Sequence, residues 1–129
     1  MPKALFVAAA LLVAAVLPGG AWAQSVQVGA APAGVHLAGG GFVDPEGRPL
    51  YEFGWDTMKG MSHCVGACAK TWNPFVAGSD AKPMGDWSII ERGDGSHQWA
   101  YKDKPLYTFS KDTAGKPATG VSMNWTLAN

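Results

Sequence analysis

An excess of charge of either sign is missing from this sequence. Its 129 residues contain ten basic and ten acidic side chains, so the formal net charge at pH 7 is zero when histidine is neutral. Proteins that bind nucleic acid or an anionic membrane surface need a basic patch, and this balance supplies none. We therefore expect neither nucleic acid nor an anionic membrane as a partner.

A long hydrophobic run is missing as well. The apolar segment over residues 4–17 follows a lysine, precedes Ala21-Trp22-Ala23 and is shorter than the roughly 20 residues that span a bilayer. A basic start, a short apolar core and small residues at A-x-A spacing are features of a secretory signal peptide. We expect cleavage after Ala23, so that residues 1–23 are lost and the mature chain is secreted or periplasmic, without a transmembrane segment. Gln24 rather than cysteine follows the site, so we expect no lipid anchor.

Cysteine is scarce, since only Cys64 and Cys68 occur. An exported chain meets an oxidising compartment, where two such cysteines are expected to form a disulfide. A bridge over so short a loop stabilises the fold by about 2 kcal/mol in the chain-entropy model. It therefore holds a local turn and is not a framework for the whole fold.

What the sequence does contain is an internal repeat. Residues 48–57 return as residues 104–113, with Pro, Leu, Tyr, Phe, Asp and Thr at the same places and a basic residue at the start of each copy. Within each copy the aromatic residues alternate with other residues, which is typical of a strand with one aromatic face. Such a repeat indicates one structural unit used twice.

Short strands and turns dominate the rest of the chain. The 17 glycines and nine prolines are typical of many strands joined by turns. Predicted strands cover residues 42–44, 50–55, 86–92, 97–102, 105–110 and 121–127, and one or two helical turns are predicted within residues 64–72. We predict a mainly β fold, a small antiparallel meander built from two degenerate repeats with a short helical, disulfide-containing insert. Residues 24–40 are expected to be a loose N-terminal lead, and residues 41–129 a single β domain.

The repeated motif resembles a known family. Tyr51-x-Phe53-x-x-Asp56 and Tyr107-x-Phe109-x-x-Asp112 match the Tyr-x-aromatic-x-x-Asp signature of a bacterial secreted-repeat family of unknown function, often labelled predicted lipoproteins. The Cys-x-x-x-Cys element followed by Trp72 and Pro74 is similar to that family as well. The resemblance covers about residues 42–125 and implies export and a repeated β unit. It does not extend to lipid attachment, because the cysteine that carries the lipid in such members is absent.

The aromatic residues have two interpretations. Large rings fill a thin core, each burying about 150–250 Å², or they form a stacking surface for sugars, peptidoglycan fragments or a flat cofactor. Most of them occupy strand-periodic positions, which favours the core. Trp55 is the candidate for an exposed ring, because its counterpart in the second copy is Lys111.

Asp56 and Asp112 have two interpretations as well. Two carboxylates are a possible acid–base pair, but equivalent residues of two repeats are expected to do the same local work, bonding to backbone N–H groups in the turn that follows each strand. Spacing ties no histidine or nucleophile to them. We therefore predict no catalytic residue and do not expect an enzyme.

The densest cluster of metal-ligand side chains is Met58, Met61 and His63, next to Cys64. Thioether and imidazole groups suit copper, whereas cysteines in a disulfide offer no thiolate. The alternative interpretation of the chain is that these three residues form a Cu(I) site on a loop. His36 and His97 are expected to be turn or surface residues.

These observations favour an exported, non-enzymatic binding or envelope-associated module that needs no cofactor and whose ligand the sequence does not identify. The alternative is a periplasmic copper-binding or copper-trafficking protein that uses Met58, Met61 and His63.

Overall fold

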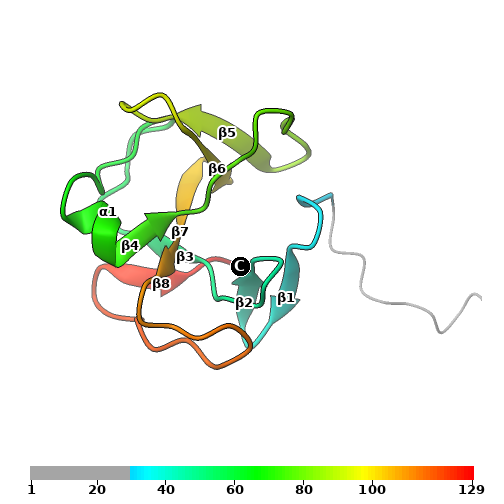
Figure 1. Cartoon of the computed structure of the whole chain (residues 1–129), viewed down its shortest axis with the longest axis vertical. Coiled ribbons are helices and arrows are strands. Elements are labelled where there is room, and N and C mark those ends of the chain that lie inside the picture. Colours follow the sequence, from blue (N-terminus) through cyan, green and yellow to red (C-terminus); the bar gives the residue numbers. More distant parts are fainter. Residues whose placement is uncertain (1–29) are drawn as a thin grey trace, which may run out of the picture.

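The computed structural model describes residues 30–129 (Figure 1). The predicted signal peptide and its cleavage site lie outside the described residues. Within residues 30–129, no helix is both long and apolar enough to cross a membrane.

The described chain is an antiparallel β structure with one short helix. Its elements are β1 (His36–Ala38), β2 (Gly41–Val43), β3 (Tyr51–Phe53), α1 (Cys68–Thr71), β4 (Trp72–Pro74), β5 (Trp87–Glu91), β6 (His97–Tyr101), β7 (Lys104–Phe109) and β8 (Trp125–Leu127). The predicted fold class, with its short helical insert and its disulfide, is confirmed. A strand start is expected at residues 35–37, at the end of the N-terminal lead, and β1 lies there. One local prediction differs from the structure, since β4 follows the helical turn directly.

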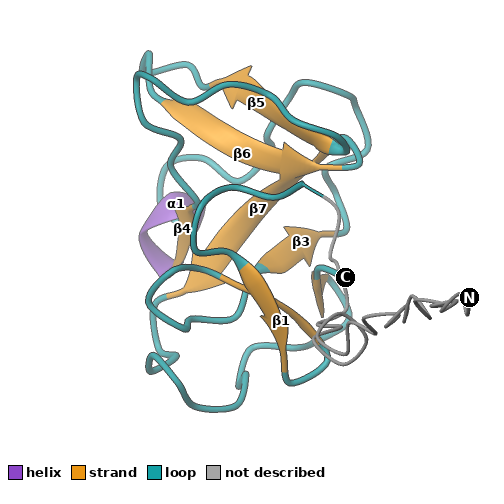
Figure 2. Ribbon diagram, turned by 90° about the vertical axis from the view of Figure 1, so that its right-hand side faces the viewer, coloured by secondary structure: helices purple, strands orange, loops and turns teal. Residues whose placement is uncertain are grey.

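Strand order in the main sheet does not simply follow the chain. The order is β5-β6-β7-β3-β8, with β4 paired to β7, while β1 and β2 form a separate two-stranded sheet. Within the main sheet, only β5, β6 and β7 lie side by side in chain order, as in a meander (Figure 2). β3 and β7 carry the repeated motif and pair antiparallel at the centre, with Tyr51 opposite Tyr107.

The two repeats have the same plan and are interleaved. Each consists of a hairpin, a motif strand and a closing strand: β1–β2, β3 and β4 in the first repeat, and β5–β6, β7 and β8 in the second. Each closing strand pairs with the motif strand of the other repeat, β4 with β7 and β8 with β3. The hairpins consequently lie at opposite ends of the molecule (Figure 1).

Matching backbone hydrogen bonds establish which residues correspond. Phe75 N donates to Leu106 O, and Ala128 N donates to Leu50 O, both at 2.9 Å. The carbonyl groups of Phe75 and Ala128 accept in turn from Trp99 N at 2.9 Å and from Phe42 N at 2.8 Å. Leu50 therefore corresponds to Leu106, and Phe42 to Trp99.

A stack of four rings joins the two repeats in the core. Trp72 and Trp125, from the two closing strands, stack with their ring centroids 3.8 Å apart. Phe109 stacks on the outer side of Trp72 at 4.4 Å, and Phe53 on that of Trp125 at 4.3 Å. Because each tryptophan stacks on a phenylalanine of the other repeat, neither repeat completes this core by itself. Trp55 lies outside it, with 66% of its surface exposed.

Candidate functional site

The repeated motif forms two hydrogen bonds that cross between the repeats. The Tyr51 hydroxyl donates to Asp112 Oδ2 at 2.5 Å, and the Tyr107 hydroxyl donates to Asp56 Oδ2 at 2.6 Å. All four side chains are buried. Each tyrosine thus bonds to the aspartate of the other copy, which gives the Tyr-x-aromatic-x-x-Asp spacing a structural purpose.

The other carboxylate oxygen of each aspartate closes a loop. Asp56 Oδ1 accepts from His63 N at 2.6 Å, and Asp112 Oδ1 accepts from Thr119 N at 2.8 Å. In both cases the donor lies seven residues after the aspartate. The expected bonds to backbone N–H groups are therefore present, but they span a longer loop than a tight turn.

Burial and the adjacent carboxylates extend the pH range over which both tyrosines stay protonated, beyond the ordinary pKa of a phenol. Burial, followed by the hydrogen bond to Asp112, raises the pKa of Tyr51 to about 12. Burial, followed by the hydrogen bond to Asp56, also raises the pKa of Tyr107. The neutral phenols can therefore keep donating, and their place in the core assigns them to holding the fold.

The loop after Asp56 carries the candidate copper ligands. Met58 and Met61 are 55% and 46% exposed, and Nδ1 of the exposed His63 lies 3.4 Å from Asp56 Oδ1. Among the described residues, no group of three or more His, Cys, Asp or Glu side chains is placed to hold a metal ion. His36 and His97 both lie at the surface, in β1 and at the start of β6.

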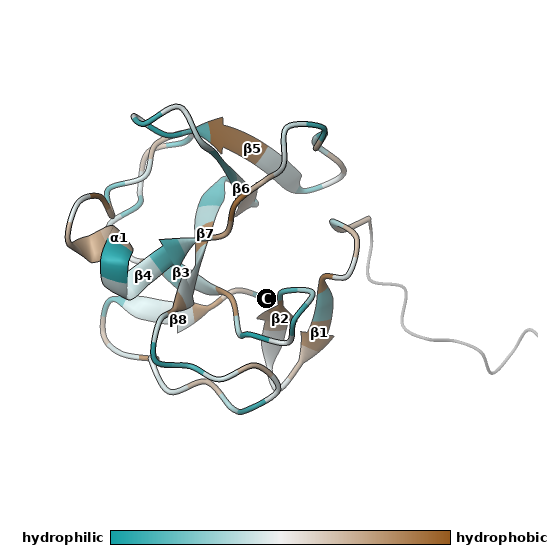
Figure 3. Cartoon of the chain, viewed as in Figure 1, coloured by the Kyte–Doolittle hydropathy of each residue, from teal (hydrophilic) through white to brown (hydrophobic). Residues whose placement is uncertain are grey.

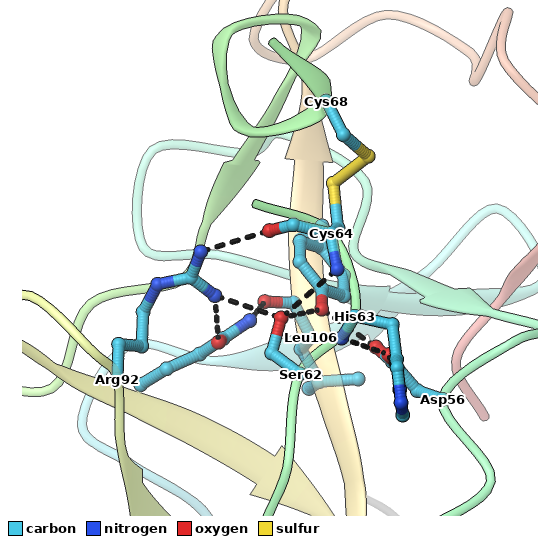
Figure 4. The surroundings of a disulfide bond; sticks show 9 residues. Asp56, Ser62, His63, Cys64, Cys68, Arg92 and Leu106 are labelled. Atoms are coloured by element: carbon cyan, nitrogen blue, oxygen red, sulfur yellow. Dashed lines mark hydrogen bonds and ion pairs between the residues drawn. A yellow bond between two sulfur atoms is a disulfide. The ribbon is translucent and has the colours of Figure 1, made fainter. Parts of the chain in front are cut away.

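The same loop ends at the disulfide and is held by an arginine. Cys64 and Cys68 are bonded, and Arg92 donates to Ser62 Oγ at 2.9 Å, to Gln98 Oε1 at 2.7 Å and to Cys64 O at 2.8 Å (Figure 4). Gln98 is fully buried, and its Nε2 donates to Leu106 O at 2.7 Å. Sequence reasoning missed Arg92 and Gln98, because nothing in their local pattern relates the second hairpin to the cysteine loop.

A cleft lies between the first hairpin and the loop that follows β7. Its volume is about 480 Å³, and in Figure 1 that loop passes below β1 and β2. Apolar side chains and glycine backbone make up most of its lining: Ala38, Gly39, Gly41, Phe42, Val43, Gly47, Pro49, Gly115, Pro117, Ala118, Val121 and Leu127. His36 and Lys116 complete the lining.

Larger side chains occupy the corresponding positions in the second repeat. Because Phe42 corresponds to Trp99, Gly41 corresponds to Gln98. Their cross-strand partners are Ala38 and Ile90, which therefore correspond as well. Ile90 and Gln98 are buried, and the end of β5 is strongly hydrophobic (Figure 3).

The difference arises from the length of the hairpins and from the size of their residues. Toward its turn the second hairpin continues for one more cross-strand pair, Glu91 with His97, and the turn supplies Arg92. The first hairpin turns earlier, through Gly39 and Gly40, and has no such extension. At Gly41 a Cβ atom would lie 2.7 Å from Ala128 O, so the close approach of β2 to β8 requires glycine. The two repeats therefore share their order of strands but differ in their hairpins, and the cleft lies beside the shorter hairpin.

Taken together, the two interleaved β units and the exchanged Tyr–Asp pairs define a two-repeat β protein with a cleft beside its first hairpin. The family model described as a secreted repeat of unknown function matches residues 38–76 and 88–129. The chain belongs to this secreted-repeat family, as its motifs indicated. No curated protein and no solved structure matches it. The two matched segments follow the two structural repeats.

Proposed function

We propose that the protein is an exported, non-enzymatic binding module and that the cleft of the first repeat receives its ligand. The observation that carries this proposal is the cleft itself, which lies beside Ala38 and Gly41, whereas the corresponding positions of the second repeat hold the larger, buried side chains of Ile90 and Gln98. Its volume of about 480 Å³ falls within the range of about 300–1,000 Å³ that is usual for small-molecule sites. A largely apolar lining with a few polar groups is also usual for such sites.

The residues that line the cleft favour binding over catalysis. Serine, threonine, cysteine, aspartate and glutamate are all missing from the lining residues that the structure describes. Covalent or acid–base catalysis needs a nucleophile or a proton-transfer group with a positioned partner. His36 and Lys116 do not form such a set, and no cofactor is part of this proposal.

A neutral fluorescent probe, N-phenyl-1-naphthylamine, tests the cleft. We expect the mature chain to bind it with enhanced fluorescence and the Ala38→Phe variant to bind it at least about tenfold more weakly, because the new ring occupies the cleft. Leu37→Phe is the matched control, since successive side chains of a strand point to opposite faces and Leu37 does not line the cleft. Circular dichroism and thermal melting confirm that both variants fold. Equal binding by wild type and Ala38→Phe would exclude the cleft as the site.

Export rests on the signal-like segment and on the family's description as secreted. We propose cleavage after Ala23 and a mature chain without lipid. The intact mass of the exported protein should equal that of residues 24–129. A mass that includes residues 1–23, or an added lipid, would contradict this proposal.

Copper binding is the second candidate, favoured by the exposure of two methionines on the loop that also carries His63. A Cu(I) titration against a competing chelator, with the disulfide intact, tests it. If copper binds, the melting temperature of the wild type rises with metal concentration, and changing Met58, Met61 and His63 to alanine abolishes the rise. Wild-type binding no tighter than about micromolar, roughly −8 kcal/mol, would exclude a copper function.

A further inference from the structure

The basic groups of the cleft indicate which chemical class of ligand it takes. We propose that the cleft selects a small apolar acid, a molecule with one carboxylate on an apolar body. This inference rests on the proposed function, since it assigns the ligand class of the same cleft. It follows from the charges in the lining and from their distribution between the two repeats.

Both titratable residues in the lining are basic, and both belong to the open cleft alone. Lys116 is the fourth residue after Asp112, and the fourth residue after Asp56 is Gly60. His36 pairs with Val43, and the corresponding pair in the second repeat is Ser88 with Ala100. The second repeat therefore has neither a histidine nor a lysine at these positions. Its own basic group, Arg92, is engaged by Ser62, Gln98 and the Cys64 carbonyl, so it offers no free charge to a ligand there.

The geometry of His36 leaves one ring nitrogen for a ligand. Its Nδ1 lies 3.0 Å from Gly34 O, and because a carbonyl oxygen only accepts, Nδ1 carries the proton. Nε2 has no protein hydrogen bond among the described residues. It can therefore accept from a protonated acid when the ring is neutral, or donate to a carboxylate when the ring is charged.

The acidic residues near the cleft in sequence are engaged elsewhere. Asp112, four residues before Lys116, bonds to Tyr51 and Thr119, and Asp44 and Glu46, which follow the first hairpin, bond within their own turn. Arg48 Nη1 lies 2.7 Å from Glu46 Oε2 and 3.9 Å from Asp44 Oδ2. Asp44 Oδ1 also accepts from the backbone N–H groups of Glu46 and Arg48. None of these carboxylates lines the cleft. The charge that a ligand meets in the lining is therefore the ammonium group of Lys116.

The rest of the lining suits an apolar body. Ala38, Val43 and Pro49 lie on the hairpin side, and Pro117 and Ala118 on the loop side. Burying apolar surface between them is favourable, whereas a cationic ligand would meet the like charge of Lys116. A compact aromatic or branched aliphatic carboxylic acid satisfies both requirements.

A matched pair of competitors tests the ligand class. 1-Naphthoate and 1-naphthamide have the same ring system, but only the former carries a charge. We expect 1-naphthoate to displace N-phenyl-1-naphthylamine from the mature wild-type protein at about tenfold lower concentration than 1-naphthamide. Lys116→Gln should remove this preference while the neutral probe still binds. Lys111→Gln is the control, because Lys111 is exposed on the same loop and does not line the cleft.

The outcomes separate this inference from the proposal beneath it. If both competitors act equally and Lys116→Gln changes nothing, the acid preference is wrong and the binding module stands. If Lys111→Gln removes the preference as fully as Lys116→Gln does, the charge assignment is wrong. If the neutral probe does not bind, or if Ala38→Phe leaves its binding unchanged, the cleft is not a ligand site and both proposals fall.

Discussion

Each aspartate of the repeated motif serves two parts of the molecule at once. Oδ2 of Asp56 accepts from Tyr107 in the other repeat, while Oδ1 accepts from the backbone of His63 in its own loop. A buried carboxylate is costly unless its oxygens are paired, and here both oxygens have donors. The tyrosine hydroxyl therefore contributes to the stability of the fold together with the aspartate, because removing it takes the phenol donor away from a buried carboxylate oxygen.

Replacing either motif tyrosine by phenylalanine should destabilise the fold. We expect Tyr51→Phe and Tyr107→Phe each to lower the free energy of unfolding by about 1–3 kcal/mol, because a buried acceptor loses its donor. Tyr101→Phe is the control, since Tyr101 is half-buried and its hydroxyl makes no hydrogen bond within the described structure. Urea unfolding measures all three. A loss for Tyr101→Phe as large as for the motif tyrosines would contradict this role.

The raised pKa of Tyr51 predicts a loss of stability at alkaline pH. An unfolded tyrosine has a pKa of about 10, and in the folded protein the pKa of Tyr51 is about 12. The neutral form is favoured by folding, so its contribution is complete below pH 10 and disappears as the pH rises toward 12. We expect the urea midpoint to be flat from about pH 7 to 9 and to fall above about 10, with a shallower fall for Tyr51→Phe. An equally steep fall in that variant would assign the effect to other groups.

At the scale of elements, hairpin length separates the two repeats. The additional pair at the end of β5 and β6 places Arg92 over the cysteine loop, where one guanidinium group bonds to three oxygens. The first hairpin turns at Gly39 and Gly40 and leaves its cleft open. The position of the turn is therefore one difference between the hairpins of the two repeats, and it accompanies the cleft in the first repeat and the Arg92 contacts in the second.

Removing the guanidinium group should loosen the cysteine loop. We expect Arg92→Met to lower the free energy of unfolding by about 1.5–3 kcal/mol, because hydrogen bonds to a charged group are lost. Amide exchange of residues 62–64 should also become faster. Arg92→Lys should not restore protection, since an ammonium group lacks the planar fork that reaches several acceptors. Lys102→Met is the surface control, and unchanged exchange in Arg92→Met would show that the disulfide alone holds the loop.

At the scale of the whole molecule, the repeats depend on each other because their closing strands are exchanged. β4 of the first repeat pairs with β7 of the second, and β8 of the second repeat pairs with β3 of the first. The Trp72–Trp125 stack and both Tyr–Asp bonds lie where the repeats meet. In a separated half, each of these residues would lose its partner from the other repeat and be exposed to solvent.

The two halves should fold only together. We expect residues 24–80 and residues 81–129 each to give poorly dispersed amide spectra alone, because an isolated hairpin is marginally stable. Mixing them should restore dispersion, since each supplies the closing strand that the other lacks. The same mixture with Trp72→Ala should assemble poorly, because the ring stack is broken. A well-dispersed spectrum from either half alone would show that a repeat is an independent unit.

From the sequence alone, the repeated motif, the β class and the disulfide could be predicted, because each depends on local pattern. Alternation over residues 50–55 and 105–110 reflects the geometry of a single strand, and two cysteines in an exported chain have only each other as partners. The short strand β4 was missed because Asn73-Pro74 resembles the end of a helix, and only pairing with β7 makes these residues extended.

The tertiary structure alone decided which residues meet. No local pattern relates Tyr51 to Asp112, 61 positions away, or Arg92 to Cys64, because such contacts depend on which strand edges pair. The cleft has the same origin, since nothing in the sequence relates Ala38 to Lys116, and they line one cleft only because the loop after β7 lies beside the first hairpin. Local periodicity is a property of one segment, whereas a binding site is a property of several segments placed together.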